Sequence, residues 1–126
     1  MRALALVLAL VACAPHRAVT PAIPEADRLA AEFIVAKSYG EQLGVLGHCE
    51  PRSARVETTK ADFAAHWRRT FSGPGYERIM VVFRNGIIDG HLLGARLAVE
   101  ACPDRERTYR RVRAAIEIMR EGERYP

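Results

Sequence analysis

Glycines at a helical spacing are the feature of this sequence that most constrains its fold. Gly86, Gly90 and Gly94 are four residues apart, and Ala98 continues the spacing, so in a helix they share one narrow stripe. A glycine inside a helix costs up to about 1 kcal/mol relative to alanine. Three glycines in register therefore indicate that another backbone packs directly against them. We predict a long helix over residues 75–101 with this stripe in close contact with a second helix.

The partner helix is predicted upstream. Ala36, Gly40 and Gly44 repeat the four-residue spacing, within a segment whose apolar residues step by threes and fours. Acidic side chains in the first turn of this segment suit the dipole of a helix. We therefore predict a helix over residues 25–47, packed along its small-residue stripe against the helix over residues 75–101.

A β-hairpin is the main alternative for the central stretch. Asn85-Gly86 lies between two apolar runs, and this dipeptide is a strong hairpin signal when strand-forming residues flank it. Against a hairpin, the flanking residues do not alternate apolar with polar, and the glycine spacing continues for two further turns. A helix is therefore the prediction, and a break near Asn85-Gly86 is the alternative.

Two further helices complete the predicted domain. A capping-box-like start at Thr59 and an aromatic ridge at four-residue spacing predict a short helix over residues 59–71 that closes the core; the ridge is Phe63, Trp67 and Phe71. A proline start and an amphipathic stripe predict a last helix over residues 103–121. The fold class predicted for residues 25–126 is an all-α four-helix bundle.

The N-terminus carries the pattern of an export signal. Met1-Arg2 precede an unbroken apolar run over residues 3–12. The run is too short to span a bilayer, which takes about 20 residues, and it is typical of a signal peptide. It ends in Leu10-Val11-Ala12-Cys13, which resembles the lipobox of bacterial lipoproteins. The resemblance implies a signal peptide over residues 1–12, lipidation of Cys13 with more than one acyl chain, and, with Ala14 next, sorting to the outer membrane.

The segment after the signal is predicted to be a tether. Residues 13–24 hold three prolines and no helical period. At about 3.1 Å per residue, the extended residues 14–24 reach roughly 34 Å at most, so the domain stays near its membrane and faces the periplasm. Ordinary signal cleavage after Ala14 is the alternative to lipidation, but it would place Pro15 directly after the cut, a disfavoured arrangement.

The two remaining cysteines are predicted to form a disulfide. Cys49 and Cys102 each follow one of the glycine-striped helices, and an exported compartment is oxidising. If these helices run parallel, as alternate members of a bundle, their ends approach each other. A bridge that closes a loop of about 54 residues stabilises the fold by roughly 4 kcal/mol in the chain-entropy account, which matters in a domain this small.

The last predicted helix is rich in arginine on the side opposite its apolar stripe. Several of these charges can pair locally, which is typical of a solvated face. The other interpretation is a surface for an acidic partner or anionic headgroups, formed by Arg105, Arg107, Arg110, Arg111 and Arg113. The net charge of +4 is mild, and we predict no nucleic-acid partner.

No catalytic, cofactor or metal motif emerges from the sequence. His48-Cys49 are adjacent rather than at ligand spacing, and the usual two-cysteine and two-histidine motifs are missing. We interpret His66 and His91 as surface or helix-end residues. Asp89 lies close to His91 in the chain, but no nucleophile accompanies them, so an enzyme is possible without being supported. We predict no cofactor, no metal and no enzymatic activity.

Two resemblances cover parts of the domain. Gly86-Ile87-Ile88-Asp89-Gly90, followed by Cys102-Pro103 and an amphipathic helix, resembles the G-Y-I-x-G … C-P pattern of exported immunity proteins of the Rap and Tai kind, with isoleucine at the tyrosine position. Those are small helical periplasmic proteins with disulfides that bind and neutralise secreted toxins. The order Cys49, Trp67-Arg68, Phe83 … Gly86, Cys102 resembles uncharacterised exported proteins of proteobacteria, which implies no activity.

The sequence therefore predicts a lipoprotein that acts by binding. We expect a membrane-anchored, non-catalytic module that serves an envelope assembly through a protein partner. The alternative is an immunity-type inhibitor that binds and neutralises a toxin or enzyme in the periplasm.

Overall fold

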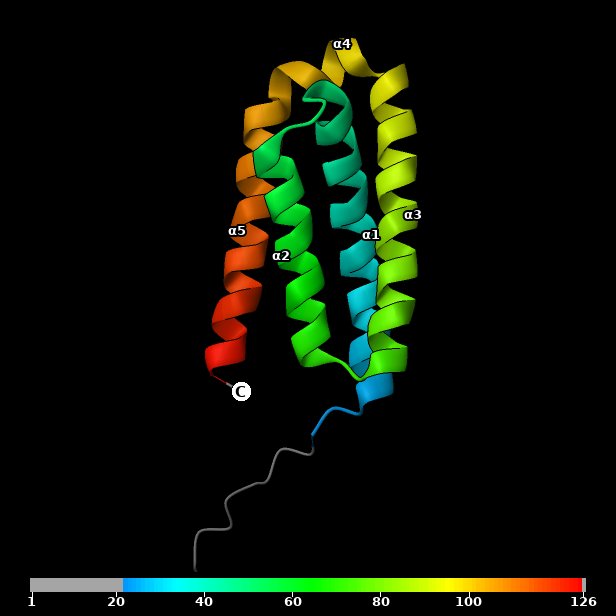
Figure 1. The fold of residues 1–126 in the computed structure, drawn as a ribbon, viewed down its shortest axis with the longest axis vertical. Coiled ribbons are helices and arrows are strands. Elements are labelled where there is room, and N and C mark those ends of the chain that lie inside the picture. The colour runs from blue at the N-terminus through cyan, green and yellow to red at the C-terminus, as the bar shows by residue number, and fades with distance from the viewer. Residues whose placement is uncertain (1–21, 126) are drawn as a thin grey trace, which may run out of the picture.

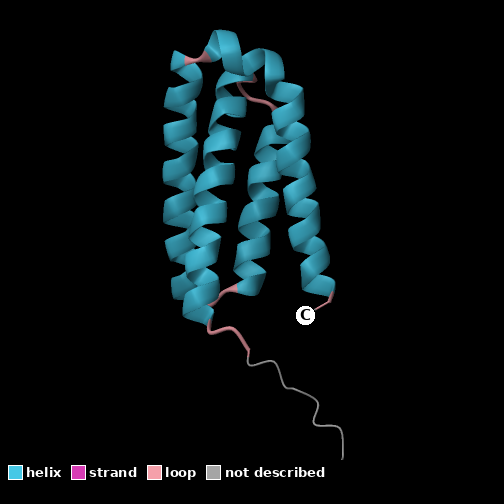
Figure 2. Ribbon diagram, turned by 180° about the vertical axis from the view of Figure 1, so that it is seen from behind, coloured by secondary structure: helices cyan, strands magenta, loops and turns pink. Residues whose placement is uncertain are grey.

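Four long helices run alternately up and down the bundle in the computed structural model, which describes residues 22–125 (Figure 1). The long helices are α1 (Glu25–Cys49), α2 (Ala54–Thr70), α3 (Gly73–Arg96) and α5 (Arg105–Arg124), and the corner between α3 and α5 holds α4 (Ala98–Ala101) and a 3-10 turn, η1 (Cys102–Asp104). Figure 2 shows helices and loops, and no strand, within this range. The predicted all-α bundle is confirmed, while the predicted signal peptide, Cys13 and nearly all of the tether lie outside the described residues.

The central stretch is helical through Asn85-Gly86, so the hairpin alternative is wrong. The prediction of one helix as far as residue 101 is also wrong, because α3 ends at Arg96. Leu97 leaves the helical conformation with φ −116° and ψ 25°, and the chain then turns across the end of the bundle through α4 and η1. This turn brings Cys102 to the end of α1.

α2 begins five residues before the predicted start. Its first residue is Ala54, and Thr59 is a buried interior residue whose hydroxyl donates to the Arg55 carbonyl at 2.8 Å. The loop between α1 and α2 is therefore short, and it turns at Arg52, which has a positive φ of 60°. α1 likewise runs through Gly47 to its last residue, two beyond the prediction, and α5 runs three beyond it.

The aromatic ridge of α2 fills the core. Phe63 and Trp67 are fully buried, and their ring centroids lie 5.8 Å and 5.0 Å from that of Phe83 on α3. Tyr39 of α1 stacks on Phe63 at 5.5 Å. Burial of one such side chain contributes about 1.5–3 kcal/mol, so this cluster is a main source of stability in the bundle. Phe71, the last residue of the ridge, is only half-buried because it follows the end of α2.

Candidate functional site

The glycine stripes bring the backbones of α1 and α3 into direct contact. A Cβ atom at Gly90 would lie 1.9 Å from the Glu41 carbonyl oxygen, and one at Gly44 would lie 2.1 Å from the Ile87 carbonyl oxygen. Real Cβ atoms do not approach other atoms below 3.0 Å, so only glycine fits at these positions. All the predicted packing glycines are buried in this seam, which consists of Gly40, Gly44, Gly86, Gly90 and Gly94.

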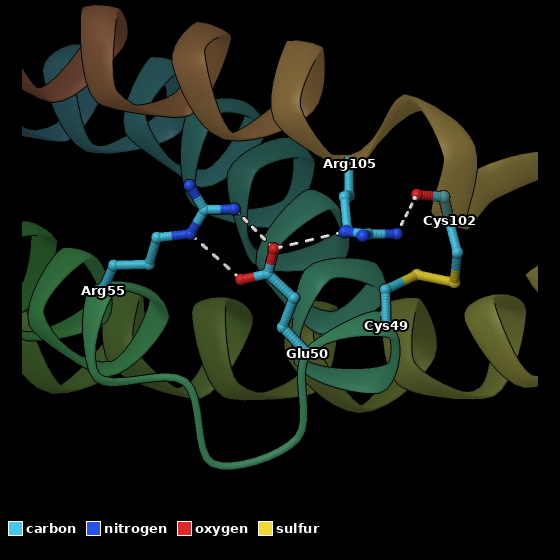
Figure 3. The surroundings of a disulfide bond; sticks show 5 residues. All are labelled: Cys49, Glu50, Arg55, Cys102 and Arg105. Carbon is cyan, nitrogen blue, oxygen red and sulfur yellow. Dashed lines mark hydrogen bonds and ion pairs between the residues drawn. A yellow bond between two sulfur atoms is a disulfide. The ribbon is translucent and has the colours of Figure 1, made fainter.

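The predicted disulfide forms between the last residue of α1 and η1, the turn that follows α3 and α4. Cys49 and Cys102 are bonded with their Cα atoms 5.4 Å apart. Figure 3 shows the ion pairs that surround the bond: Glu50 accepts from Arg55 Nε at 3.0 Å, and Arg105 lies 3.6 Å from Glu50 and donates to the Cys102 carbonyl at 3.1 Å. The hydrogen bond from Arg55 is the main cause that lowers the pKa of Glu50. This end of the bundle is thus held by covalent and ionic links together.

The predicted arginine surface divides into two members that connect α5 to the end of α1 or to α2 and three members that do not. Arg113 is half-buried and donates to Asp62 at 2.6 Å and to Glu117 at 2.7 Å, so it serves the contact between α2 and α5. Arg105 is engaged beside the disulfide. The other three are exposed, and we call them the arginine face: Arg107, Arg110 and Arg111. Within residues 22–125, only Arg107 of these three makes an ion pair, a solvent-exposed contact of 3.6 Å with Asp104.

A cavity that the sequence did not predict opens at the other end of the bundle. It has a volume of about 870 Å³, within the range of small-molecule sites. It lies between the start of α1 and the ends of α2 and α5. Apolar side chains form much of its wall, among them Ile23, Ala31, Phe71 and Met119.

The polar groups of this cavity are largely paired with one another. The ring of His66 is buried and its Nδ1 bonds to Glu123, while Arg69 donates to both oxygens of Glu123 at 3.0 Å. These contacts lower the pKa of Glu123, with the Arg69 hydrogen bond as the main cause. Glu32 accepts from the indole N–H of Trp67 at 2.9 Å. His66 was interpreted as a surface or helix-end residue; it lies near the end of α2 but is buried. Its place three residues after Phe63, on the ridge side of α2, is the signal that could have identified its burial.

Asp89 and His91 do not form an acid–base pair. Both are exposed, and two residues on a helix are separated by about 200° around its axis, so they lie on opposite flanks of α3. The ring of His91 meets that of His48 edge-on, with centroids 5.2 Å apart. Across residues 22–125, no group of three His, Cys, Asp or Glu side chains is placed to hold a metal ion.

None of the helices in the described range is long and apolar enough to cross a membrane. No protein-family model, curated protein or solved structure matches this chain.

Proposed function

We propose that this chain is a small non-catalytic binding module of the bacterial envelope. In this proposal, lipidated Cys13 anchors it in the outer membrane and the arginine face binds an acidic protein in the periplasm. The observation that supports the proposal is the exposure of Arg107, Arg110 and Arg111, in contrast to the engaged Arg113. Arginine is enriched at protein interfaces, where its planar head binds carboxylates through two hydrogen bonds.

An exposed apolar side chain extends the same surface. Ile118 lies two turns after Arg111 on the same side of α5, and it is 69% exposed. A protein interface combines such an apolar contact with charged groups around it. Anionic headgroups would need only the charges, so this combination favours a protein partner.

The position of the arginine face also favours a protein over the anchoring membrane. The described chain enters at the start of α1, whereas the arginine face is in the first two turns of α5, at the disulfide end (Figure 1). A helix of 25 residues, the length of α1, spans about 37 Å. In the proposed arrangement, the arginine face lies at the end of the bundle remote from the tether, where a periplasmic protein can reach it.

A charge-reversal pull-down tests the arginine face. The tagged full chain is cross-linked in the envelope of the cells that naturally produce it and is then purified. The Arg110→Glu/Arg111→Glu variant is treated in parallel. The matched control is Arg96→Glu/Arg124→Glu, which makes the same charge change at exposed positions elsewhere. We expect an acidic protein to be captured by the wild type and the control, and at least about tenfold less by the variant.

Equal capture by the variant and the wild type would exclude the arginine face as the binding site. The partner also distinguishes the two predicted roles, because an inhibitor captures a toxin or enzyme and an accessory captures an assembly component. Mass spectrometry of the mature N-terminus tests the anchor separately, and an N-terminus without acyl chains would disprove it.

A further inference from the structure

α3 carries a second apolar stripe on the side opposite the glycine seam. Val81, Ile88 and Leu92 are 55%, 58% and 53% exposed, which is unusual for three large apolar side chains on one helix of a small domain. Asn85 and Ala95 lie on the same stripe and are also exposed. In chain order, the successive steps between Val81, Asn85, Ile88, Leu92 and Ala95 are four, three, four and three residues. This alternation is the heptad repeat of a coiled coil, here over about two heptads.

The heptad assigns each residue a position. Val81, Ile88 and Ala95 occupy d positions, and Asn85 and Leu92 occupy a positions. A single asparagine at an a position is a device that specifies register, because it pairs with the same asparagine of a parallel partner helix. In an antiparallel pair Asn85 would instead face apolar side chains, and its amide would lose its hydrogen bonds to water without replacement.

The charges beside the stripe are complementary between two parallel copies. Arg84 is at the g position before Asn85, and Asp89 is at the e position after Ile88. In a parallel coiled coil a g residue contacts the e residue five positions later on the partner helix. Arg84 of each copy therefore meets Asp89 of the other. Within the described part of the chain, neither residue makes an ion pair, so both are available.

We propose that two copies of this chain pair through α3 in a parallel, two-fold symmetric dimer. The two-fold axis makes the contact self-complementary, so Asn85 meets Asn85 and each Arg84–Asp89 pair occurs twice. α3 and α5 lie on opposite sides of the molecule in both views (Figures 1 and 2), so pairing through α3 leaves the arginine face free.

The parallel arrangement also places both α1 starts at the same end of the dimer. Two chains tethered to one membrane require this arrangement. This point alone rests on the proposed lipid anchor of the proposed function. Two heptads make a weak coiled coil in dilute solution. Attachment to one surface raises the effective concentration of the copies and favours the pair.

Cysteine cross-linking in intact cells tests the dimer directly. The full chain is expressed with Asn85→Cys, which places two thiols face to face at the dimer axis. The control is Ala65→Cys, an exposed position on α2 away from the stripe. We expect a covalent dimer on non-reducing gels for Asn85→Cys and none above background for Ala65→Cys. Equal cross-linking of the two variants, or an adduct between Asn85→Cys and a different protein, would overturn the proposal.

A charge exchange tests the parallel register. Arg84→Asp alone and Asp89→Arg alone each create two like-charge contacts across the dimer, so each should reduce the cross-linked fraction by roughly fivefold. The double variant restores opposite charges and should restore the cross-linked fraction. Failure of the double variant to recover, with helicity by circular dichroism unchanged in all variants, would exclude the parallel pairing.

Discussion

Replacement of Gly90 by alanine tests whether backbone contact between α1 and α3 holds the bundle together. The added Cβ atom would lie 1.9 Å from the Glu41 carbonyl oxygen and 2.6 Å from its carbonyl carbon. Ordinary contact begins at 3.4 Å, so the helices must separate by about 1.5 Å, since neither backbone has a flexible end that can move aside.

The expected loss follows from two opposing terms. Alanine favours a helix over glycine by about 1 kcal/mol. Overpacking of a rigid contact costs typically about 1–3 kcal/mol, and separation of the seam also loosens the aromatic core beside it. We therefore expect Gly90→Ala to lower the free energy of unfolding by about 2 kcal/mol, equivalent to a fall in Tm of about 8 °C in a domain of this size.

Urea and thermal denaturation of the oxidised protein, followed by circular dichroism, measure this effect. The matched control is Gly122→Ala, because Gly122 lies in α5 with no atom within 4 Å of a Cβ placed there. Gly122→Ala should stabilise the protein by up to about 1 kcal/mol. If the two variants are equally stable, the contact between the backbones does not carry the stability that we assign to it.

Three further predictions concern the ends of the bundle. Replacement of Cys49 and Cys102 by serine should lower the free energy of unfolding by about 4 kcal/mol, and an unchanged urea midpoint would contradict this. Because Arg69 holds the pKa of Glu123 below its ordinary value, this pair stabilises the fold above the unfolded-state pKa and loses its effect as pH falls through the folded-state pKa. Glu123→Gln should thus be less stable than the wild type at pH 7, with a difference that shrinks below about pH 4 in urea titrations; a constant difference would contradict this account. Glu32→Ala should lower the free energy of unfolding by about 1–3 kcal/mol, because it leaves the buried indole N–H of Trp67 without an acceptor. Glu32→Gln keeps an acceptor and should lower it by less in the same urea titrations.

The seam and the disulfide were predictable because they depend on local rules. A four-residue spacing identifies one face of a helix wherever the helix packs, so Gly40, Gly44 and Gly90 could be assigned to a contact from the sequence. The cysteines at the ends of those helices then follow from parallel packing. Prediction of the seam therefore needed only the helical period and the rule that glycines in register within a helix indicate a closely packed second backbone.

The cavity and the turn at Leu97 depend on contacts between distant segments. His66 and Glu123 are 57 residues apart, and no local pattern links them. Leu97 is flanked by helix-forming residues, so the break there is set by the path of the chain toward Cys102. Arg113 was grouped with the exposed arginines because its partner, Asp62, lies on another helix.

The disulfide also acts as a check on the alignment of the seam. A stripe of small residues that repeats every four positions can match its partner in more than one register, since a slip of one turn places glycine against glycine again. Such a slip displaces the end of α3 by about 5.4 Å along α1. Cys102 follows α3 after only five residues, and a disulfide tolerates Cα separations of only about 4.4–6.8 Å. The disulfide can therefore form in only one of the registers that the glycines permit. Oxidation stabilises that register selectively over the alternatives.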